Sequence, residues 1–407
     1  MKKRFSVPLM LAGFAGILTV SPAAMAGDMN NMDSLKQQIQ LLIQQNKQLA
    51  ARVSQLEHEQ TVRLPVTDDV LEKKVTKILR HKEKEQLSEE SFGHRINKFV
   101  DFNGLIEVAG STSSSFADES ESTFELATVE LGFVGSMTDW AEAHLTLLYE
   151  EGGDDKVLID DAHIIIGNSD KCPFYLSFGR QYVPFGNFTS NMISDPLTLE
   201  IAETQETALQ LGFAANGAYG SVFAFNGDTN QGGGDSQIEQ FGANIGYAFH
   251  SDTFTLDTGI SYMNSMGDSD GLSDMLKEQE LLEADYVDGF GAYAIASIGP
   301  VSLIGEYVTA LDHFEDAAHS QPMAFNIETA YSFSLGQIPS TAALAYQGTD
   351  DMAGTLPESR ILGTMALGIF DNTTLAFEYA HDEDYDETDG GTKGSADTFT
   401  GQLSYEF

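Results

Sequence analysis

The chain ends with TFTGQLSYEF, residues 398–407, in which apolar and polar side chains alternate strictly. In an extended strand, one face would carry Phe399, Gly401, Leu403, Tyr405 and Phe407. A strand with one apolar and one polar face suits a wall that has lipid outside and water inside. A C-terminal strand that ends in Phe is also typical of bacterial outer-membrane barrels. The stretch therefore predicts the strand that closes a β-barrel.

The same period of two recurs along the chain from residue 99 onward. Many of the alternating segments approach the ~9–11 residues that a tilted β-strand needs to cross a bilayer. We therefore predict an all-β transmembrane barrel of about 16 antiparallel strands over residues 99–407. The candidate strands are residues 99–109, 124–134, 140–150, 156–166, 174–180, 207–214, 219–226, 239–249, 253–263, 288–298, 301–311, 323–333, 341–347, 360–370, 373–381 and 398–407.

The connections between these segments alternate in length, as outer loops and periplasmic turns do in outer-membrane barrels. Short turns follow the even-numbered strands, and long connections follow the odd-numbered ones. The exception is the connection after the third strand, 151–155, which is short. An even strand number places both ends of the barrel on the periplasmic side. The long connections are residues 110–123, 181–206, 227–238, 264–287, 312–322, 348–359 and 382–397.

The first 98 residues have a different character. Residues 1–26 read as a signal peptide, with a basic start, an apolar stretch and an Ala-Met-Ala cleavage site. Residues 27–64 predict a periplasmic α-helical coiled coil, because four leucines recur every seven residues. A lone amphipathic helix packed on its own barrel is the alternative. Residues 65–98 predict a basic helical linker, which is either a solvated face or a contact with lipid headgroups or cell-wall polymer.

Oligomeric state stays open at this level. Ile and Val at the a positions with Leu at d lean towards a dimeric coiled coil. A porin-like barrel favours a homotrimer by analogy of fold. We expect the trimer, with the dimer as the alternative.

Charge separates the two regions of the chain. The chain of 407 residues has a net charge of −41, from 21 basic and 62 acidic residues. Residues 1–100 hold 15 of the basic and 11 of the acidic residues, which leaves 6 and 51 for the rest. Such an acidic region excludes nucleic-acid binding. The sole cysteine, Cys172, allows no intrachain disulfide. No motif for an enzyme, a metal site or a cofactor is recognisable.

The connection 181–206, QYVPFGNFTSNMISDPLTLEIAETQE, is rich in apolar residues, unlike the other long connections. An apolar loop is poorly suited to water, so we expect it to fold into the lumen and narrow the pore. Packing against a neighbouring barrel or across the rim is the alternative. The charged residues that could line a constriction are Arg180, Asp195, Glu200, Glu203 and Glu206.

Polar positions on the strands provide a second set of candidate residues. Rings of carboxylates favour cations. The alternative, that these side chains only keep the lumen hydrated, stands equally with a role in selectivity. The predicted lumen-lining residues are Glu107, Glu130, Glu142, His144, Asp160, Asp257, Glu306 and Glu328.

Several stretches resemble one family. The heptad helix, KFVDFNGLIEVAG at 98–110, GRQYVPFGNF at 179–188, SDPLTLEIAET at 194–204 and the terminal SYEF are similar to LbtU-type siderophore porins, relatives of the legiobactin receptor. The resemblance spans almost the whole mature chain. It implies a sixteen-stranded outer-membrane barrel with its N-terminus in the periplasm, surrounded by lipid and lipopolysaccharide.

The resemblance further implies passive, TonB-independent uptake of a ferric siderophore, since no plug domain precedes residue 99. No ligand residues carry over from the family. The acidic barrel disagrees with an anionic siderophore. The alternatives are therefore a general cation-selective porin, or a structural tether between outer membrane and cell wall.

Overall fold

The computed structural model describes residues 94–97, 99–117, 119–151, 156–169, 171–229, 238–278, 286–314 and 321–407. The predicted signal peptide and coiled coil, and nearly all of the predicted linker, lie outside these residues. The barrel is described here by itself. Among the described residues, no helix combines the length and apolarity needed to cross a membrane.

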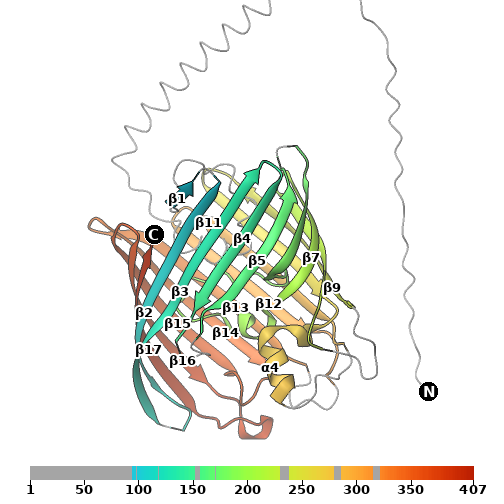
Figure 1. Ribbon diagram of the computed structural model, residues 1–407. Coiled ribbons are helices and arrows are strands. Elements are labelled where there is room, and N and C mark those ends of the chain that lie inside the picture. Colours follow the sequence, from blue (N-terminus) through green and yellow to red (C-terminus); the bar gives the residue numbers. More distant parts are fainter. Residues whose placement is uncertain are drawn as a thin grey trace, which may run out of the picture. The chain divides into compact units, whose positions relative to one another are not determined.

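Sixteen antiparallel strands form a closed ring (Figure 1). Each strand pairs with the next in the chain, and the last pairs with the first, so the predicted closed barrel of 16 strands is confirmed. The strands are β2 (Val100–Ser114), β3 (Ser120–Thr138), β4 (Ala141–Tyr149), β5 (Leu158–Gly167), β6 (Phe174–Tyr182), β7 (Gln205–Ala215), β8 (Ala218–Phe225), β9 (Gln240–His250), β10 (Phe254–Met263), β11 (Gly289–Ile298), β12 (Val301–Ala310), β13 (Met323–Leu335), β14 (Ile338–Asp350), β15 (Ser359–Phe370), β16 (Thr373–Glu383) and β17 (Ser395–Glu406).

The closing seam is where the terminal alternating stretch predicts it. Strand β17 pairs with β2 from Glu406 opposite Leu105 to Thr398 opposite Ser113. The backbones of Phe407 and Gly104 exchange two hydrogen bonds of 2.8 and 3.0 Å beyond the end of the strand. The Phe407 ring covers Gly104, whose missing side chain leaves room for it. The C-terminal residue thus completes the ladder of the seam.

A seventeenth strand, β1 (His94–Asn97), pairs with the start of β2. Its partners, residues 100–102, lie just beyond the part of β2 that β17 occupies. The sequence pattern does not predict this strand, because four residues are too few to show a period.

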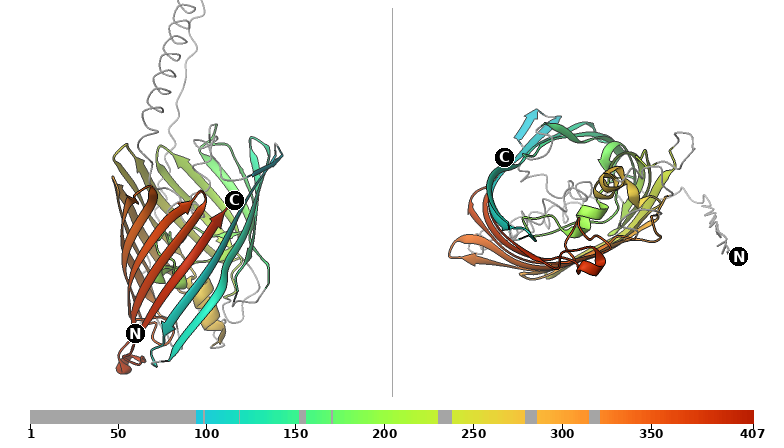
Figure 2. Two further views of the ribbon diagram at one scale, coloured as in Figure 1. Left: turned by 90° about the vertical axis from the view of Figure 1, so that its left-hand side faces the viewer. Right: turned by 90° about the horizontal axis from the view of Figure 1, so that it is seen from below.

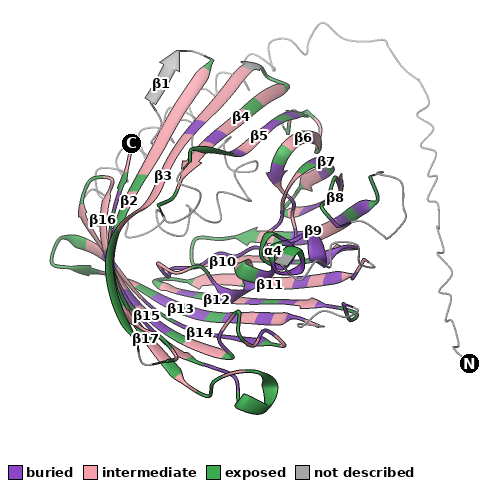
Figure 3. Ribbon diagram, turned by 60° about the horizontal axis from the view of Figure 1, so that its bottom comes forward, coloured by how far each residue is buried: buried purple, intermediate pink, exposed green. Residues whose placement is uncertain are grey.

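Buried, half-buried and exposed residues alternate along the barrel strands (Figure 3). On β13, Ile327 and Tyr331 point outward and are 60% and 52% exposed, whereas the intervening Glu328 is 2% exposed. Exposed apolar side chains of this kind recur around the ring, and lipid outside the wall removes the cost of leaving them uncovered. Examples are Phe178, Leu211, Val222, Ile245, Ile260, Leu303, Leu344, Ile361, Phe377 and Leu403.

One predicted long loop is wrong. The chain between the first two barrel strands, predicted as a loop over 110–123, is mostly strand, since β2 continues to Ser114 and β3 begins at Ser120. The residues are mainly Ser and Thr, whose β-branched or hydroxyl side chains pair well across strands. Thr112 accordingly hydrogen-bonds the carbonyl of Glu121 and the hydroxyl of Ser122.

Among the described residues, the helices lie towards the end of the barrel where the other long connections lie (Figure 1). They are α3 (Leu197–Ala202), the 3₁₀ turn η1 (Met266–Asp268), α4 (Asp270–Glu278) and the 3₁₀ turn η2 (Glu387–Asp389). Viewed along the barrel axis, α3 and α4 fall within the ring of strands (Figure 2). The lumen is therefore partly filled by loops from one end.

Candidate functional site: a narrowed passage through the lumen

The connection between β6 and β7, residues 183–204, is called the inner loop below. It folds into the barrel, as its apolar composition predicts, and most of its residues are buried. Phe185 is 1% exposed, and Leu197 and Ile201 of α3 are fully buried. Burying each such side chain contributes about 1.5–3 kcal/mol. The inner loop is therefore packed in place by its own apolar side chains.

Two wall glutamates hold the start of the inner loop. Glu306 of β12 accepts the backbone N–H groups of Asn187 at 2.6 Å and Phe188 at 3.1 Å, and the Thr198 hydroxyl at 2.8 Å. Glu328 of β13 accepts the N–H of Asn191 at 2.8 Å. Hydrogen bonds to a carboxylate are about twice as strong as neutral ones. The carboxylates thus fix the backbone of the loop against the wall.

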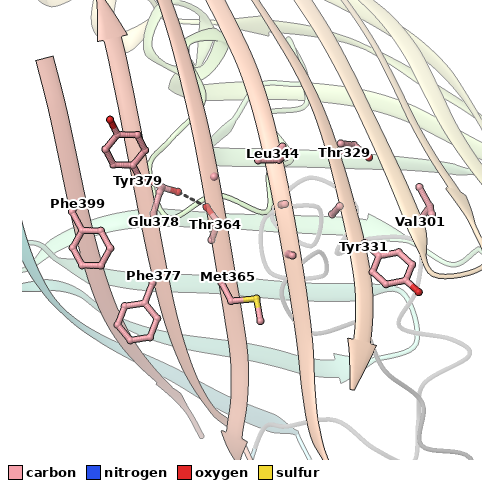
Figure 4. A pocket seen from close by; sticks show the side chains of 14 residues that line it. Val301, Thr329, Tyr331, Leu344, Thr364, Met365, Phe377, Glu378, Tyr379 and Phe399 are labelled. Carbon is pink, nitrogen blue, oxygen red and sulfur yellow. Dashed lines mark hydrogen bonds between the residues drawn. The ribbon is translucent and has the colours of Figure 1, made fainter. Parts of the chain in front are cut away.

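A third glutamate, Glu378 of β16, holds the middle of the inner loop. It accepts the N–H of Ile193 at 2.6 Å and that of Ser194 at 3.0 Å. Thr364 of β15 donates to the same carboxylate at 2.8 Å (Figure 4). Together, Glu306, Glu328 and Glu378 are called the wall glutamates. They span β12 to β16, so the loop follows the inner wall across five strands.

The outer side of the same wall is apolar. A shallow pocket of about 620 Å³ lies over β12 to β17, and Figure 4 shows its labelled residues. Phe377 and Tyr379 flank Glu378 along β16, so they project to the opposite face from the carboxylate. The lining consists mostly of apolar and aromatic groups, which suit contact with membrane hydrocarbon.

The connection between β10 and β11 supports the inner loop from a second side. The Ser269 hydroxyl donates to the carbonyl of Ile201 at 2.8 Å, and the Asp270 N–H donates to the carbonyl of Glu203 at 2.8 Å. Leu272 and Leu276 of α4 are fully buried in the same apolar cluster as Ile201. These contacts fill one side of the lumen with a packed core.

Beside the inner loop lies a cavity of about 600 Å³, called the passage below. One wall comes from β2, β3 and β4, and another from β15, β16 and β17, where Thr364, Thr374, Thr400, Gln402 and Ser404 provide polar groups. The inner loop forms the wall between them, with Phe188, Met192, Ile193 and Leu199 among its lining residues. The inner loop therefore narrows the lumen to one side of the barrel.

The passage is lined by carboxylates without basic residues. Four carboxylates come from the β2–β4 wall and two from the inner loop: Glu107, Glu125, Glu130, Glu150, Asp195 and Glu203. No Lys or Arg is among the residues that line the cavity. Low-dielectric walls concentrate the field of such charges.

None of the six basic residues of the barrel region is among the residues that line the passage. Four form ion pairs with aspartates: Lys171 with Asp139, Lys277 with Asp228, Arg360 with Asp382 and Lys393 with Asp386. Arg180 donates to the side chain of Gln205, and Lys156 precedes β5. No basic side chain of the lining therefore offsets the negative charge of the six carboxylates.

The predicted constriction residues are divided by the fold. Asp195 and Glu203 line the passage. Arg180 and Glu200 are exposed, and Glu206 lies in the β7 ladder opposite Gln181. These three are not part of the cavity lining.

The predicted lumen-lining residues are also divided. Glu107 and Glu130 line the passage, and Glu306 and Glu328 hold the inner loop. Asp160 accepts a hydrogen bond from Tyr182, and Asp257 accepts one from Tyr219.

Glu142 and His144 lie on β4 outside the cavity lining. Glu142 accepts the Ser136 hydroxyl at 3.2 Å and lies 3.3 Å from Nε2 of His144. The His144 ring stacks on His163 of β5, with centroids 4.9 Å apart. Among the described residues, no group of three or more His, Cys, Asp or Glu is arranged to hold a metal ion.

Sequence reasoning missed three functional glutamates. Glu378 lies between Phe377 and Tyr379 of an alternating strand, so the pattern could have found it. Glu125 and Glu150 fall at the loop ends of β3 and β4, where their orientation depends on a β-bulge between Glu107 and Ala109 and on where β4 ends. Neither feature is visible in the sequence.

Fold and lumen together define a porin-like barrel: sixteen strands, an apolar outer face and a loop folded inward. Solved porins share this architecture. The anion-selective porin from Comamonas acidovorans gives a TM-score of 0.55 at 11% identity over 76% of this chain and 99% of that one. Salmonella typhi OmpF in complex with daunomycin gives 0.55 at 12% identity over 76% and 97%. At these identities the likeness concerns the fold alone.

Sequence relatives are found among the UPF0422 proteins. One from Coxiella burnetii is 30% identical over 301 residues, which cover 70% of this chain and 64% of that protein. One from Legionella pneumophila is 24% identical over 362 residues, which cover 76% and 66%. The chain thus spans about two thirds of the length of the relatives it matches. No protein-family model matches the chain.

Proposed function

We propose that the protein is a passive, cation-preferring channel of the outer membrane. The porin-like fold supports a channel, and the apolar belt supports a place in a bilayer. The observation that carries the selectivity is the passage lined by six carboxylates and no Lys or Arg. Small cations and neutral solutes enter such a passage more readily than anions.

The orientation and partners follow from the same proposal. The long loops face outward, towards lipopolysaccharide, and both ends of the barrel face the periplasm. The predicted coiled coil then lies in the periplasm and assembles a homo-oligomer, for which a trimer is favoured over a dimer. Contact of the basic linker with cell-wall polymer, and with it a tethering role, belongs to the same prediction.

Ion selectivity tests this function directly. The purified full-length protein is inserted into a planar bilayer that separates two KCl concentrations, and the reversal potential is measured. A cation channel gives a potential near that of K⁺, and the preference falls with rising salt because screening shortens the reach of the carboxylates. A reversal potential near that of Cl⁻ would overturn the proposal.

A second candidate is passive, TonB-independent uptake of a ferric siderophore, which the sequence resemblance implies. The observation that favours an organic solute is the apolar lining from the inner loop, which includes Ile193 and Leu199. The carboxylates limit this candidate to neutral or cationic chelates. Growth of a deletion strain on such a chelate as its sole iron source tests it, and growth equal to that of the parent strain would count against it.

A further inference from the structure

The passage has two chemically different sides. Its β2–β4 wall carries carboxylates, of which Glu107 and Glu130 are diagonal neighbours, because Leu105 pairs with Glu130 and Glu107 pairs with Thr128. Diagonal neighbours on one face lie roughly 7–8 Å apart. The Glu107 carboxylate also accepts the Ser404 hydroxyl at 3.0 Å, which orients it across the seam.

The inner-loop side adds apolar groups to the passage, beside the carboxylates of Asp195 and Glu203. Ile193 and Leu199 of the inner loop line the passage and are partly buried, whereas Phe188 and Met192 beside them are 5% exposed. The backbone N–H of Ile193 donates to Glu378, which fixes the backbone of the loop at this position. An apolar surface of this kind gives no favourable contact to a hydrated metal cation.

From this arrangement we propose that the passage selects organic cations with an aliphatic body, such as linear alkylammonium ions. The ammonium group lies against the carboxylates of the β2–β4 wall, and the alkyl chain lies against Ile193 and Leu199. The cavity of about 600 Å³ is within the size of small-molecule sites. The inference rests on the proposed cation channel and names its substrate class.

The apolar side of the passage can be detected by comparing ammonium ions with alkyl chains of different length. Each methylene that leaves water tightens binding up to about fourfold, so affinity rises from ethylammonium to hexylammonium. A channel with only a charged lining would bind both ions alike, because their charges are the same. The length dependence therefore separates an amphiphilic site from a simple negative field.

The experiment measures block of the K⁺ current through the full-length protein by ethyl-, butyl- and hexylammonium chloride. We expect the half-blocking concentration to fall at least tenfold from ethyl- to hexylammonium. Ile193→Ser and Leu199→Ser should flatten this series, because they weaken block by hexylammonium more than block by ethylammonium. Leu335→Ser, at an exposed position where β13 ends, is the matched control and should keep the full series.

The outcomes separate the two proposals. Cation preference with a half-blocking concentration that does not depend on chain length overturns the amphiphilic site and leaves the cation channel standing. An unchanged series in both serine variants also overturns the site, because the alkyl chain then binds elsewhere. If the wild-type protein shows no cation preference or does not conduct, the proposed cation channel is overturned, and this inference with it.

Discussion

The carboxylate of Glu306 on the barrel wall accepts the backbone N–H of Asn187 at 2.6 Å, across 119 positions of the chain. Glu306 is 6% exposed and Asn187 is 3% exposed, so water does not compete for this bond. Glu328 and Glu378 repeat the arrangement further along the same loop. The width of the passage is therefore set by wall carboxylates that do not line it themselves.

Removing one wall glutamate should loosen the inner loop. Glu306→Ala leaves the N–H groups of Asn187 and Phe188 buried without their acceptor, and each hydrogen bond to a charged group is worth about 1.5–3 kcal/mol. We expect the hydrogen-exchange protection of these two amides to fall at least about tenfold. Single-channel conductance should rise or become noisy as the loop moves.

A wall residue outside this network provides the control. Glu107→Ala removes a carboxylate from the passage lining whose hydrogen bond comes from Ser404 of β17 and not from the inner loop. It should leave the protection of the Asn187 and Phe188 amides at the wild-type level. Equal loss of protection in both variants would mean that the loop responds to charge in the lumen as a whole and not to its own acceptor.

The contact between the inner loop and α4 depends on Gly271. A Cβ at this position would lie 1.9 Å from the carbonyl oxygen of Glu200, a backbone atom that cannot move alone. Gly271→Ala should therefore separate α4 from α3, although Ala favours a helix by about 1 kcal/mol over Gly. Faster proteolysis of the connection between β10 and β11 would report the separation. Gly305→Ala, with nothing within 4 Å, should have no such effect.

The barrel was predictable from the sequence because its signal is repeated. The strands repeat the same alternation of apolar and polar residues, as β13 does with Ile327 outside and Glu328 inside. The signal of one strand is weak, but sixteen strands together give a strong one. The apolar character of the connection that holds Phe185 and Leu197 also predicts its burial correctly. Both predictions depend only on the order and type of neighbouring residues, which can be read from the sequence without knowledge of tertiary contacts.

The site was less predictable because it depends on contacts between distant residues. The alternation gives Glu306 and Glu107 the same inward orientation, yet one holds the inner loop and the other lines the passage. The difference arises from the path of the loop, which follows β12 to β16 and leaves β2 to β4 uncovered. Local patterns carry no information on which part of a wall a loop will cover.

The ionisation of Asp268 should make the stability of the connection between β10 and β11, which supports the inner loop, depend on pH. Burial raises the pKa of this carboxyl, although hydrogen bonds from Thr229 and Ser265 partly oppose the shift. The folded loop therefore prefers the protonated form. Its stability is greatest below the ordinary Asp pKa of about 3.9 and falls as pH rises through the raised value.

Asp268→Asn imitates the protonated side chain and can still accept the N–H of Thr229, which lies at 2.7 Å in the wild type. We expect the variant to protect the Met266 amide, bonded to the carbonyl of Val287, better than the wild type at pH 8. The two proteins should converge below about pH 4. Weaker protection of the variant at pH 8 would show that the ionised carboxylate stabilises the loop.

The K⁺/Cl⁻ permeability ratio should depend on the net charge of the side chains that line the passage. Two unit charges about 7 Å apart in water interact by about 0.6 kcal/mol, which raises the local concentration of a monovalent cation roughly threefold and lowers that of an anion roughly threefold. Because the two effects multiply, Glu130→Gln should lower the K⁺/Cl⁻ permeability ratio about sevenfold, and Glu130→Lys, which changes the charge by two units, about fiftyfold. Asp371→Asn, in the turn between β15 and β16, is outside the passage lining and should leave the ratio unchanged. Equal effects of Glu130→Gln and Asp371→Asn would place the selectivity in the net charge of the barrel, because a local field falls off within about 10 Å at 0.1 M salt.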